Sequence, residues 1–259
     1  MNNNASQREQ EILRELRLAG GSSRITYLAR RLDVSDETIR RNIKSLEAKG
    51  LAEKNHGGVI LTETVLHSEQ PFQARMDENA TVKKVLAYKV AQMIKDGDSL
   101  FLDIASTTAY VAEALSNHHD LFIVTNSMAV ANCLSGKNNN RVFFAGGEIR
   151  AHDGGSFGLD AIHFVQRFTF QYAILSVTAV HADIGFMLHD VPEADLSCEA
   201  AKRAQIRIIV ADSEKMGRRA PIAMPKTSSF DILVTDKKPD AAISAMLAEN
   251  EISVILPER

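Results

Sequence analysis

The sequence predicts an α/β protein with two parts, a small helical domain at the N-terminus and a larger doubly wound domain with a parallel sheet. Apolar residues follow a mainly helical period between Ser6 and Leu61, and short apolar runs alternate with helical segments from about residue 81 onward. The 259 residues have a globular composition, 45% hydrophobic and 24% charged. Alternating strands and helices are typical of crossover units, which cover both faces of a parallel sheet.

Two short helices are predicted first. Ser6 and Glu9 fit a capping box, which would satisfy the free amides at a helix start. The apolar residues of this helix recur at helical spacing: Ile12, Leu13 and Leu16. Two glycines at residues 20–23 end it, because they remove side-chain packing. The second helix has its own apolar residues: Ile25, Leu28, Ala29 and Leu32.

The third predicted helix follows a turn at Asp33 and Val34 and has two different faces. Ser35 caps it, and the acidic residues of its first turn complement the positive end of the helix dipole. Its inward residues are Ile39, Ile43 and Leu46. Its outward residues are Glu37, Thr38, Arg41, Lys44 and Ser45, with Arg40 at the flank.

A hairpin follows this helix, which ends at Gly50. Short strands at residues 51–54 and 59–61 flank a tight turn. Helix, helix, turn, helix, hairpin is the order of a winged helix-turn-helix, whose third helix enters the major groove of DNA while the hairpin tip reaches the backbone or minor groove. Arginine and lysine side chains there neutralise phosphates and donate to base edges. The predicted DNA-contacting residues are Ser35, Thr38, Arg40, Arg41, Lys44 and His56.

The charge distribution agrees with this interpretation but supports it only weakly. Residues 1–66 carry 11 basic and 9 acidic side chains, whereas the remainder carries 19 basic and 24 acidic ones. A charged helix face is usually only solvated, and such a head can also bind another protein. The capped third helix and the hairpin at Gly57 and Gly58 favour DNA.

The chain is predicted to divide into a DNA-binding domain (1–61), a linker (62–80) and an α/β domain (81–259), which the resemblance given below implies to be effector-sensing. The linker has no sustained periodicity and contains Pro71, which disfavours a continuing helix. Helices are predicted at 82–94 and 109–115. Strands are predicted at 99–102, 121–124, 142–145, 172–177, 207–211, 232–234 and 253–256.

Polar residues or glycines follow several of these strands. In open parallel sheets, ligands bind beyond the carboxyl ends of the strands. Hydroxyls and free amides at helix starts suit a phosphate or another anion, and Arg150 or Lys215 would add positive charge. Taken singly, such residues are most often helix caps. Several of them along one sheet edge predict a ligand site.

Other functional classes are disfavoured. No apolar run reaches the length of a membrane span, and the N-terminus lacks a signal-peptide pattern, so we expect a cytoplasmic protein without a membrane partner. Cys133 and Cys198 lie far apart without metal-ligand spacing, so we expect reduced thiols, no metal and no cofactor. The GxGxxG and GxxxxGK[ST] fingerprints do not occur, which disfavours nicotinamide chemistry and nucleotide hydrolysis.

The segment at residues 33–43, with Leu46, Gly50-Leu51 and the triplet at 56–58, resembles the head of DeoR-family bacterial transcriptional repressors, except that Asn42 replaces the usual Asp. The segments 100–104, 123–127, 130–132, 145–150, 153–155 and 217–220 resemble the effector domain of that family. The likeness is greatest to members that control glycerol-3-phosphate metabolism. It implies a fold similar to ribose-5-phosphate isomerase. The implied effector-binding residues, together with those placed at strand ends above, are Asp103, Ala105, Ser106, Thr107, Asn126, Gly146, Gly147, Arg150, Asp212 and Lys215.

The chain departs from the family pattern near the expected ligand. Side chains replace glycines at Ala105, Ser176 and Ala179, Gln171 replaces Asp, and Ser197 replaces Lys. Added Cβ atoms narrow the space for a ligand, and the lost lysine removes a charge suited to phosphate. A different polyol phosphate, a larger or less charged metabolite, and a degenerate pocket all remain open.

The resemblance implies a repressor that binds double-stranded operator DNA as a homo-oligomer, either dimer or tetramer. A phosphorylated sugar or polyol such as glycerol-3-phosphate would release it. The alternative is an isomerase-like enzyme in which Glu193, Glu199 or Asp212 transfers protons. Because no nucleophile–base pair or metal-spaced cluster accompanies these acids, we expect no catalysis.

Overall fold

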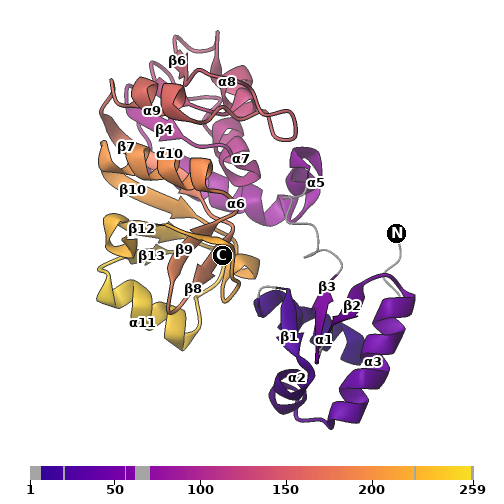
Figure 1. Cartoon of the computed structure of the whole chain (residues 1–259). Helices are drawn as coiled ribbons and strands as arrows, with labels where there is room; N and C mark the ends of the chain where they lie inside the picture. The colour runs from indigo at the N-terminus through magenta and orange to yellow at the C-terminus, as the bar shows by residue number, and fades with distance from the viewer. Residues whose placement is uncertain (1–6, 20, 56, 62–70, 225, 258–259) are drawn as a thin grey trace. The chain divides into compact units, whose positions relative to one another are not determined.

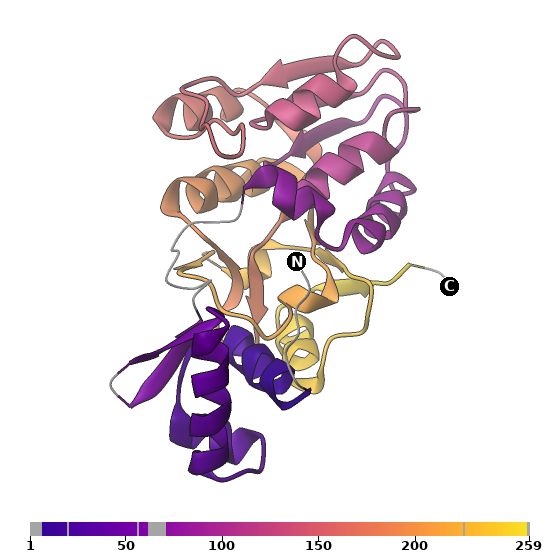
Figure 2. The same cartoon turned by 90° about the vertical axis from the view of Figure 1, so that its right-hand side faces the viewer.

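The computed structural model describes residues 7–19, 21–55, 57–61, 71–224 and 226–257. The chain forms two compact units, Met1–Glu69 and Gln70–Arg259, which we describe separately (Figures 1 and 2). Within the described residues, no helix is both long and apolar enough to cross a membrane.

Among its described residues, the first unit has three helices and a three-stranded antiparallel sheet of order β1-β3-β2. Its elements are α1 (Gln7–Leu18), β1 (Ser22–Arg24), α2 (Ile25–Arg31), α3 (Asp36–Ala48), β2 (Ala52–Asn55) and β3 (Gly58–Leu61). The predicted helices and hairpin are confirmed, and the predicted apolar stripes meet in one core, in which Ile12, Leu16 and Ile39 are fully buried. The sequence did not predict β1, because its three residues have no periodicity of their own and form a strand by pairing with β3.

The second unit is built on a seven-stranded parallel sheet of order β13-β12-β10-β7-β4-β5-β6. The strands are β4 (Ser99–Leu102), β5 (Phe122–Thr125), β6 (Arg141–Phe144), β7 (Phe170–Ser176), β10 (Ala204–Val210), β12 (Ile232–Val234) and β13 (Ser253–Ile255). The helices are α5 (Phe72–Asp77), α6 (Ala80–Ala91), α7 (Ser106–Ala114), α8 (Met128–Leu134), α9 (Leu159–Val165), α10 (Val191–Lys202) and α11 (Ala241–Glu249).

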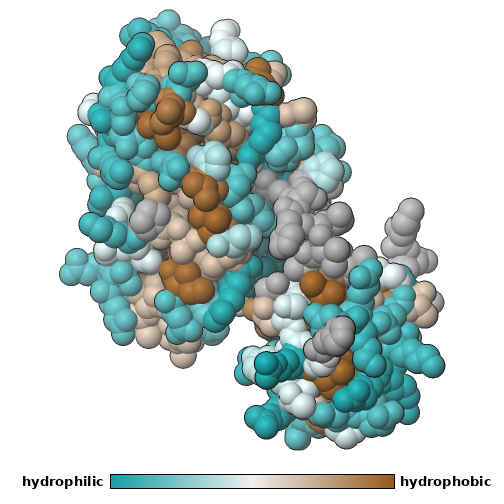
Figure 3. Space-filling model, in the orientation of Figure 1, coloured by the Kyte–Doolittle hydropathy of each residue, from teal (hydrophilic) through white to brown (hydrophobic). Residues whose placement is uncertain are grey.

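Helices cover both faces of this sheet, so the predicted doubly wound architecture is confirmed (Figure 1). Alternate strand residues face opposite sides. Leu100 and Leu102 pack in one core with α6, α7 and α8, whereas Phe101 packs in the other core with α9, α10 and α11. On the face that Figure 3 shows, hydrophobic residues form separate small patches in a mostly hydrophilic surface.

Two features of the second unit differ from the sequence analysis. A small antiparallel sheet of order β11-β9-β8 contains Ile222–Ala223, Gly185–Leu188 and Ala179–His181, and these strands of two to four residues are too short to show alternation. In the segment expected as a linker, residues 62–70 lie outside the described residues, and Phe72–Asp77 forms the helix α5.

Candidate functional site

Helix α3 presents a cationic outer face. Arg40, Arg41 and Lys44 are exposed, whereas Ile39 and Ile43 on the opposite side are buried. This polarity follows from the apolar spacing of the helix, which turns one face toward the core of the first unit. The arrangement leaves three long cationic side chains free to reach phosphates and base edges.

The start of α3 is fixed by its cap. Ser35 Oγ accepts a hydrogen bond from the Thr38 amide at 3.2 Å and lies 2.9 Å from Thr38 Oγ1. These two predicted contact residues therefore orient the helix start. Asn42, where the family usually has Asp, donates to Thr38 O at 2.8 Å. The predicted contact His56 lies outside the described residues.

The carboxyl ends of β4 and β7 meet at the point where the strand order reverses. The chain runs outward from β4 through β5 to β6 and returns to β7 on the other side of β4. Such switch points are where open α/β sheets bind ligands. Here Asp103, which follows β4, accepts a hydrogen bond from the Ser176 amide at the end of β7, with a distance of 2.8 Å.

Asp103 is a buried acid, with 3% of its surface exposed. Burial raises the pKa of its carboxyl to about 7, although the amide of Ser176, the side chain of Thr108 and the positive charge of Lys215 oppose this rise. A carboxyl with this pKa carries only a partial negative charge at neutral pH. Asp103 is therefore compatible with a neighbouring anion.

Three buried polar atoms at this edge have no hydrogen-bond partner among the described residues. They are Asp103 Oδ1, Thr107 Oγ1 and Asn126 Oδ1. Thr107 lies in the first turn of α7, where the backbone amides have no partner within the helix. Asn126 follows β5 and donates to Ser156 O at 3.2 Å. A buried polar atom without a partner is costly, so these atoms fit a site for a polar ligand.

Two lysines approach this edge. Lys215 Nζ donates to Ser176 Oγ at 3.0 Å, and Asp212 orients the preceding turn by accepting from the Glu214 amide at 3.0 Å. The side chain of Lys83 on α6 is buried, and burial followed by the positive charge of Lys215 lowers the pKa of its ammonium. Two cations that repel one another gain stability from an anion between them.

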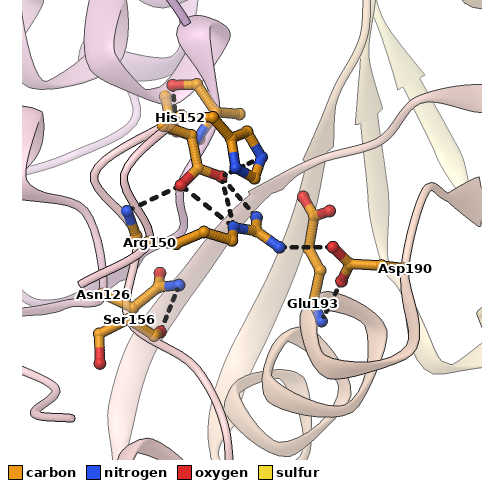
Figure 4. Close-up of polar contacts among 10 residues, drawn as sticks. Asn126, Arg150, His152, Ser156, Asp190 and Glu193 are labelled. Atoms are coloured by element: carbon orange, nitrogen blue, oxygen red, sulfur yellow. Dashed lines mark hydrogen bonds and ion pairs between the residues drawn. The ribbon is translucent and has the colours of Figure 1, made fainter. Parts of the chain in front are cut away.

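Arg150 has a structural role that the sequence did not reveal. Its Nη1 donates to Asp190 at 2.5 Å, and its Nε and Nη2 bind Asp153 (Figure 4). Its guanidinium lies 4.0 Å from the centre of the Phe157 ring. Asp190 also caps α10 by accepting from the Glu193 amide at 2.9 Å. Arg150 thus fastens the loop after β6 to the start of α10.

The two predicted loop glycines differ in what they require. Gly147 has a φ of +127°, and a Cβ there would lie 3.0 Å from Ser156 Oγ, so the loop needs glycine at this position. A Cβ on Gly146 would meet no atom within 4 Å. The carbonyl of Gly146 accepts from Ser156 Oγ at 2.8 Å, which links this loop to the strand end at Asn126.

The departures from the family pattern are not all at the ligand site. Gln171 lies near the start of β7, and its Oε1 accepts from the Ser99 amide at the start of β4, with a distance of 2.7 Å. Strand starts lie at the opposite edge of a parallel sheet, so Gln171 does not border the proposed ligand site, contrary to the expectation. Ala105 has a φ of −149°, an extended conformation that needs no glycine. Ser176 does lie at the site.

The sequence analysis missed the functional neighbours of several predicted residues. Asp153, Asp190 and Lys83 contact the site or its loop, but none of them was predicted as a site residue, although Asp153 lies within the quoted segment 153–155. Asp190 is 40 residues from its partner Arg150. No local pattern connects residues at that separation.

The two units define a protein with a winged helix-turn-helix and a separate α/β domain that has a polar switch-point site. Residues 8–65 match the DeoR-like helix-turn-helix domain, and residues 78–237 match the DeoR C terminal sensor domain. The chain therefore belongs to the DeoR family of transcriptional repressors, and the prediction of a DeoR-type repressor is confirmed.

Two relatives agree with this assignment, and it does not rest on the likeness to one solved structure. The chain is 35% identical over 238 residues to the HTH-type transcriptional repressor CsqR of Escherichia coli (strain K12), covering 92% of this chain and 90% of the relative. It is 33% identical over 229 residues to the Glycerol-3-phosphate regulon repressor of that strain, covering 88% and 90%. Ribose 5-phosphate isomerase A of Methanocaldococcus jannaschii matches with a TM-score of 0.40 and 13% identity, covering 54% and 55%.

Proposed function

We propose that this protein binds operator DNA through α3 and releases it when a phosphorylated sugar or polyol binds at the switch point of the sheet. The observation that carries the proposal is the pair of lysines beside buried polar atoms that have no partner among the described residues. An effector that binds the off-DNA conformation more tightly shifts the population away from DNA.

The charges along the site orient such an effector. Lys83 and Lys215 suit a phosphoryl group, as do the amides at the start of α7. The carboxylates of Asp153 and Asp190 surround Arg150 at the other end, next to the loop that holds Asn126. Carboxylates and amides bind hydroxyl groups, so a polyol phosphate fits better than a molecule that is charged throughout.

The proposed site residues are those predicted from the sequence, with one change of role and one addition. The DNA contacts are Thr38, Arg41 and Lys44, supported by Ser35, Arg40 and His56. The effector contacts are Asp103, Ala105, Ser106, Thr107, Asn126, Gly146, Gly147, Asp212 and Lys215. Arg150 holds the loop in place, and Lys83 joins the cationic end.

We propose a regulator without enzymatic activity, because two of the acids considered for proton transfer have structural partners. Glu199 accepts from Arg203 on the next turn of α10 at 3.0 Å, and Asp212 caps a 3-10 turn. Since one small winged helix rarely reaches operator affinity alone, we propose that a homo-oligomer binds repeated half-sites in the cytoplasm.

Fluorescence anisotropy with operator DNA, selected from a random pool by the full-length protein, tests the DNA-binding part. Arg41→Ala is expected to weaken binding about tenfold and to lower the salt slope by about 1, since one phosphate contact is lost. Arg14→Ala removes an equally exposed arginine from α1 and serves as the control. Equal losses in both variants would contradict the placement of α3 on DNA.

Calorimetry with glycerol-3-phosphate and other polyol phosphates tests the effector part. Thr107→Val removes one buried hydroxyl without changing the shape of the side chain, and we expect about tenfold weaker effector binding. Thr235→Val is the matched control, because its Oγ1 is equally buried and lacks a partner among the described residues, but it follows β12, away from the switch point. Unchanged affinity in Thr107→Val would move the site elsewhere.

A further inference from the structure

Helix α5 (Phe72–Asp77) contacts three elements that form the proposed effector site. It is also the first helix after residues 62–70, through which the chain passes from the DNA-binding unit to the sensor unit. The proposed function assigns it no role. Its hydrogen bonds connect it to the loop after β6, to α7 and to Lys83 on α6.

The N-terminal end of α5 is bonded to the loop after β6. The Phe72 amide donates to His152 O at 3.4 Å. In the sequence, His152 lies between Arg150 and Asp153. Arg150 binds Asp153 within the loop and Asp190 at the start of α10 (Figure 4). A ligand that shifts the loop therefore acts on the first residue of α5.

The last turn of α5 is bonded to α7. Tyr110 Oη donates to Met76 O at 3.0 Å, and the tyrosine is only 8% exposed. Helix α7 carries Ser106 and Thr107 in its first turn, at the effector site. Tyr110 lies one turn after Ser106 on the same helix. A ligand that moves the first turn of α7 therefore also moves the hydroxyl that donates to Met76 O.

The C-terminal end of α5 is held by Lys83. Its ammonium donates to Arg75 O and, at 2.8 Å, to Glu78 O. These carbonyls lie at a helix end, where they have no partner within the helix. A sharp turn follows at Asn79, whose φ is +53°. The positive charge of Lys215 acts on the same ammonium. An anion bound at the site would therefore compete with the α5 carbonyls for the ammonium of Lys83.

We propose that α5 is the element through which the effector site and the DNA-binding unit act on one another, with Tyr110 and Lys83 as its positioning residues. The proposal rests on the proposed function for the identity of the effector site. Coupling between two binding sites is reciprocal, so operator binding must alter α5 just as effector binding does. Because of this reciprocity, the role of α5 can be tested by adding operator DNA without any effector.

Hydrogen exchange on the full-length protein tests the proposal. The reporters are the amides of Arg75 and Glu78, which are bonded to Pro71 O at 3.2 Å and Ala74 O at 3.1 Å. Exchange is measured for the protein alone, with saturating operator, and with glycerol-3-phosphate. Operator binding is expected to change exchange at both amides in the wild type.

Tyr110→Phe removes the bond to α5 and keeps the ring in the core. We expect exchange at the α5 reporters to rise about fivefold, the size of one lost hydrogen bond. The ratio of operator dissociation constants with and without effector is expected to fall by a similar factor, while effector affinity itself is retained. Tyr172→Phe is the matched control, because its Oη donates at 3.4 Å to Met93 O, outside α5.

Two results would overturn the proposal: α5 exchange that ignores saturating operator, or a Tyr110→Phe protein whose effector response equals that of the wild type. A wild type that binds operator and ignores every polyol phosphate would refute the effector assignment instead. In that case the response of α5 to operator alone still decides the present proposal.

Discussion

The buried carboxyl of Asp103 makes the stability of the sensor unit depend on pH. Its pKa is about 7 in the folded protein, because burial disfavours the charged form, against an ordinary value of 3.8. An acid with a raised folded pKa contributes its full stability below pH 4 and loses it as the pH rises toward 7. The difference between the folded and the ordinary pKa lowers the free energy of unfolding by roughly 4 kcal/mol at pH 8, compared with its value below pH 4. Asp103→Asn removes this loss, since the amide oxygen still accepts from Ser176.

Urea unfolding of wild type and Asp103→Asn at pH 5 and pH 8 measures the effect. We expect the variant to gain roughly 3 kcal/mol relative to the wild type between these two pH values, because part of the loss has already occurred at pH 5. A carboxyl-carbon NMR titration of the wild type reports the same pKa directly. Parallel pH profiles for the two proteins would show that Asp103 is not desolvated, and the reasoning from burial would fail.

Three further substitutions test the architecture through the free energy of unfolding. Ile43→Ala empties a site that is 1% exposed in the core of the first unit and is expected to cost about 3 kcal/mol in urea unfolding, whereas a cost under 1 would mean a loosely packed head. Ser35→Ala removes the cap of α3 and is expected to cost about 1 kcal/mol in thermal unfolding, with weaker operator binding. Arg150→Met leaves the buried carboxylate of Asp153 without its partner and is expected to cost about 3 kcal/mol, measured by urea unfolding of the sensor unit.

The first unit was predictable because its signals are local. The apolar stripe at Ile39, Ile43 and Leu46 and the cap at Ser35 lie within one helix, so spacing and capping rules apply directly. Strand β1 was missed because nothing in Ser22–Arg24 requires an extended backbone until β3 pairs with it. The same reason explains the small sheet β11-β9-β8, whose strands depend on pairing between distant segments.

The candidate site was predictable only in part. Polar residues at strand ends pointed to the edge at which we propose the site, because the carboxyl ends of parallel strands share one edge whatever the details of packing. The role of Arg150 was not visible in the sequence, since its second partner, Asp190, stands at the start of α10, beyond the intervening strands β7, β8 and β9. The donors of Arg150 to Asp153 and Asp190 fasten a loop, a role that the ligand motif did not indicate.

The substitutions that separate this chain from the family pattern show why position in the sheet decides their effect. Gln171 lies at a strand start and binds the Ser99 amide there, so it is remote from the ligand edge. Ala105 occupies an extended backbone that tolerates a Cβ. Ser176 alone of the three adds a polar atom at the switch point, where its hydroxyl accepts from Lys215 and donates to Val210 O. Any effector that uses Lys215 must compete with that hydroxyl, so selectivity relative to the family depends on Ser176 more than on the other two.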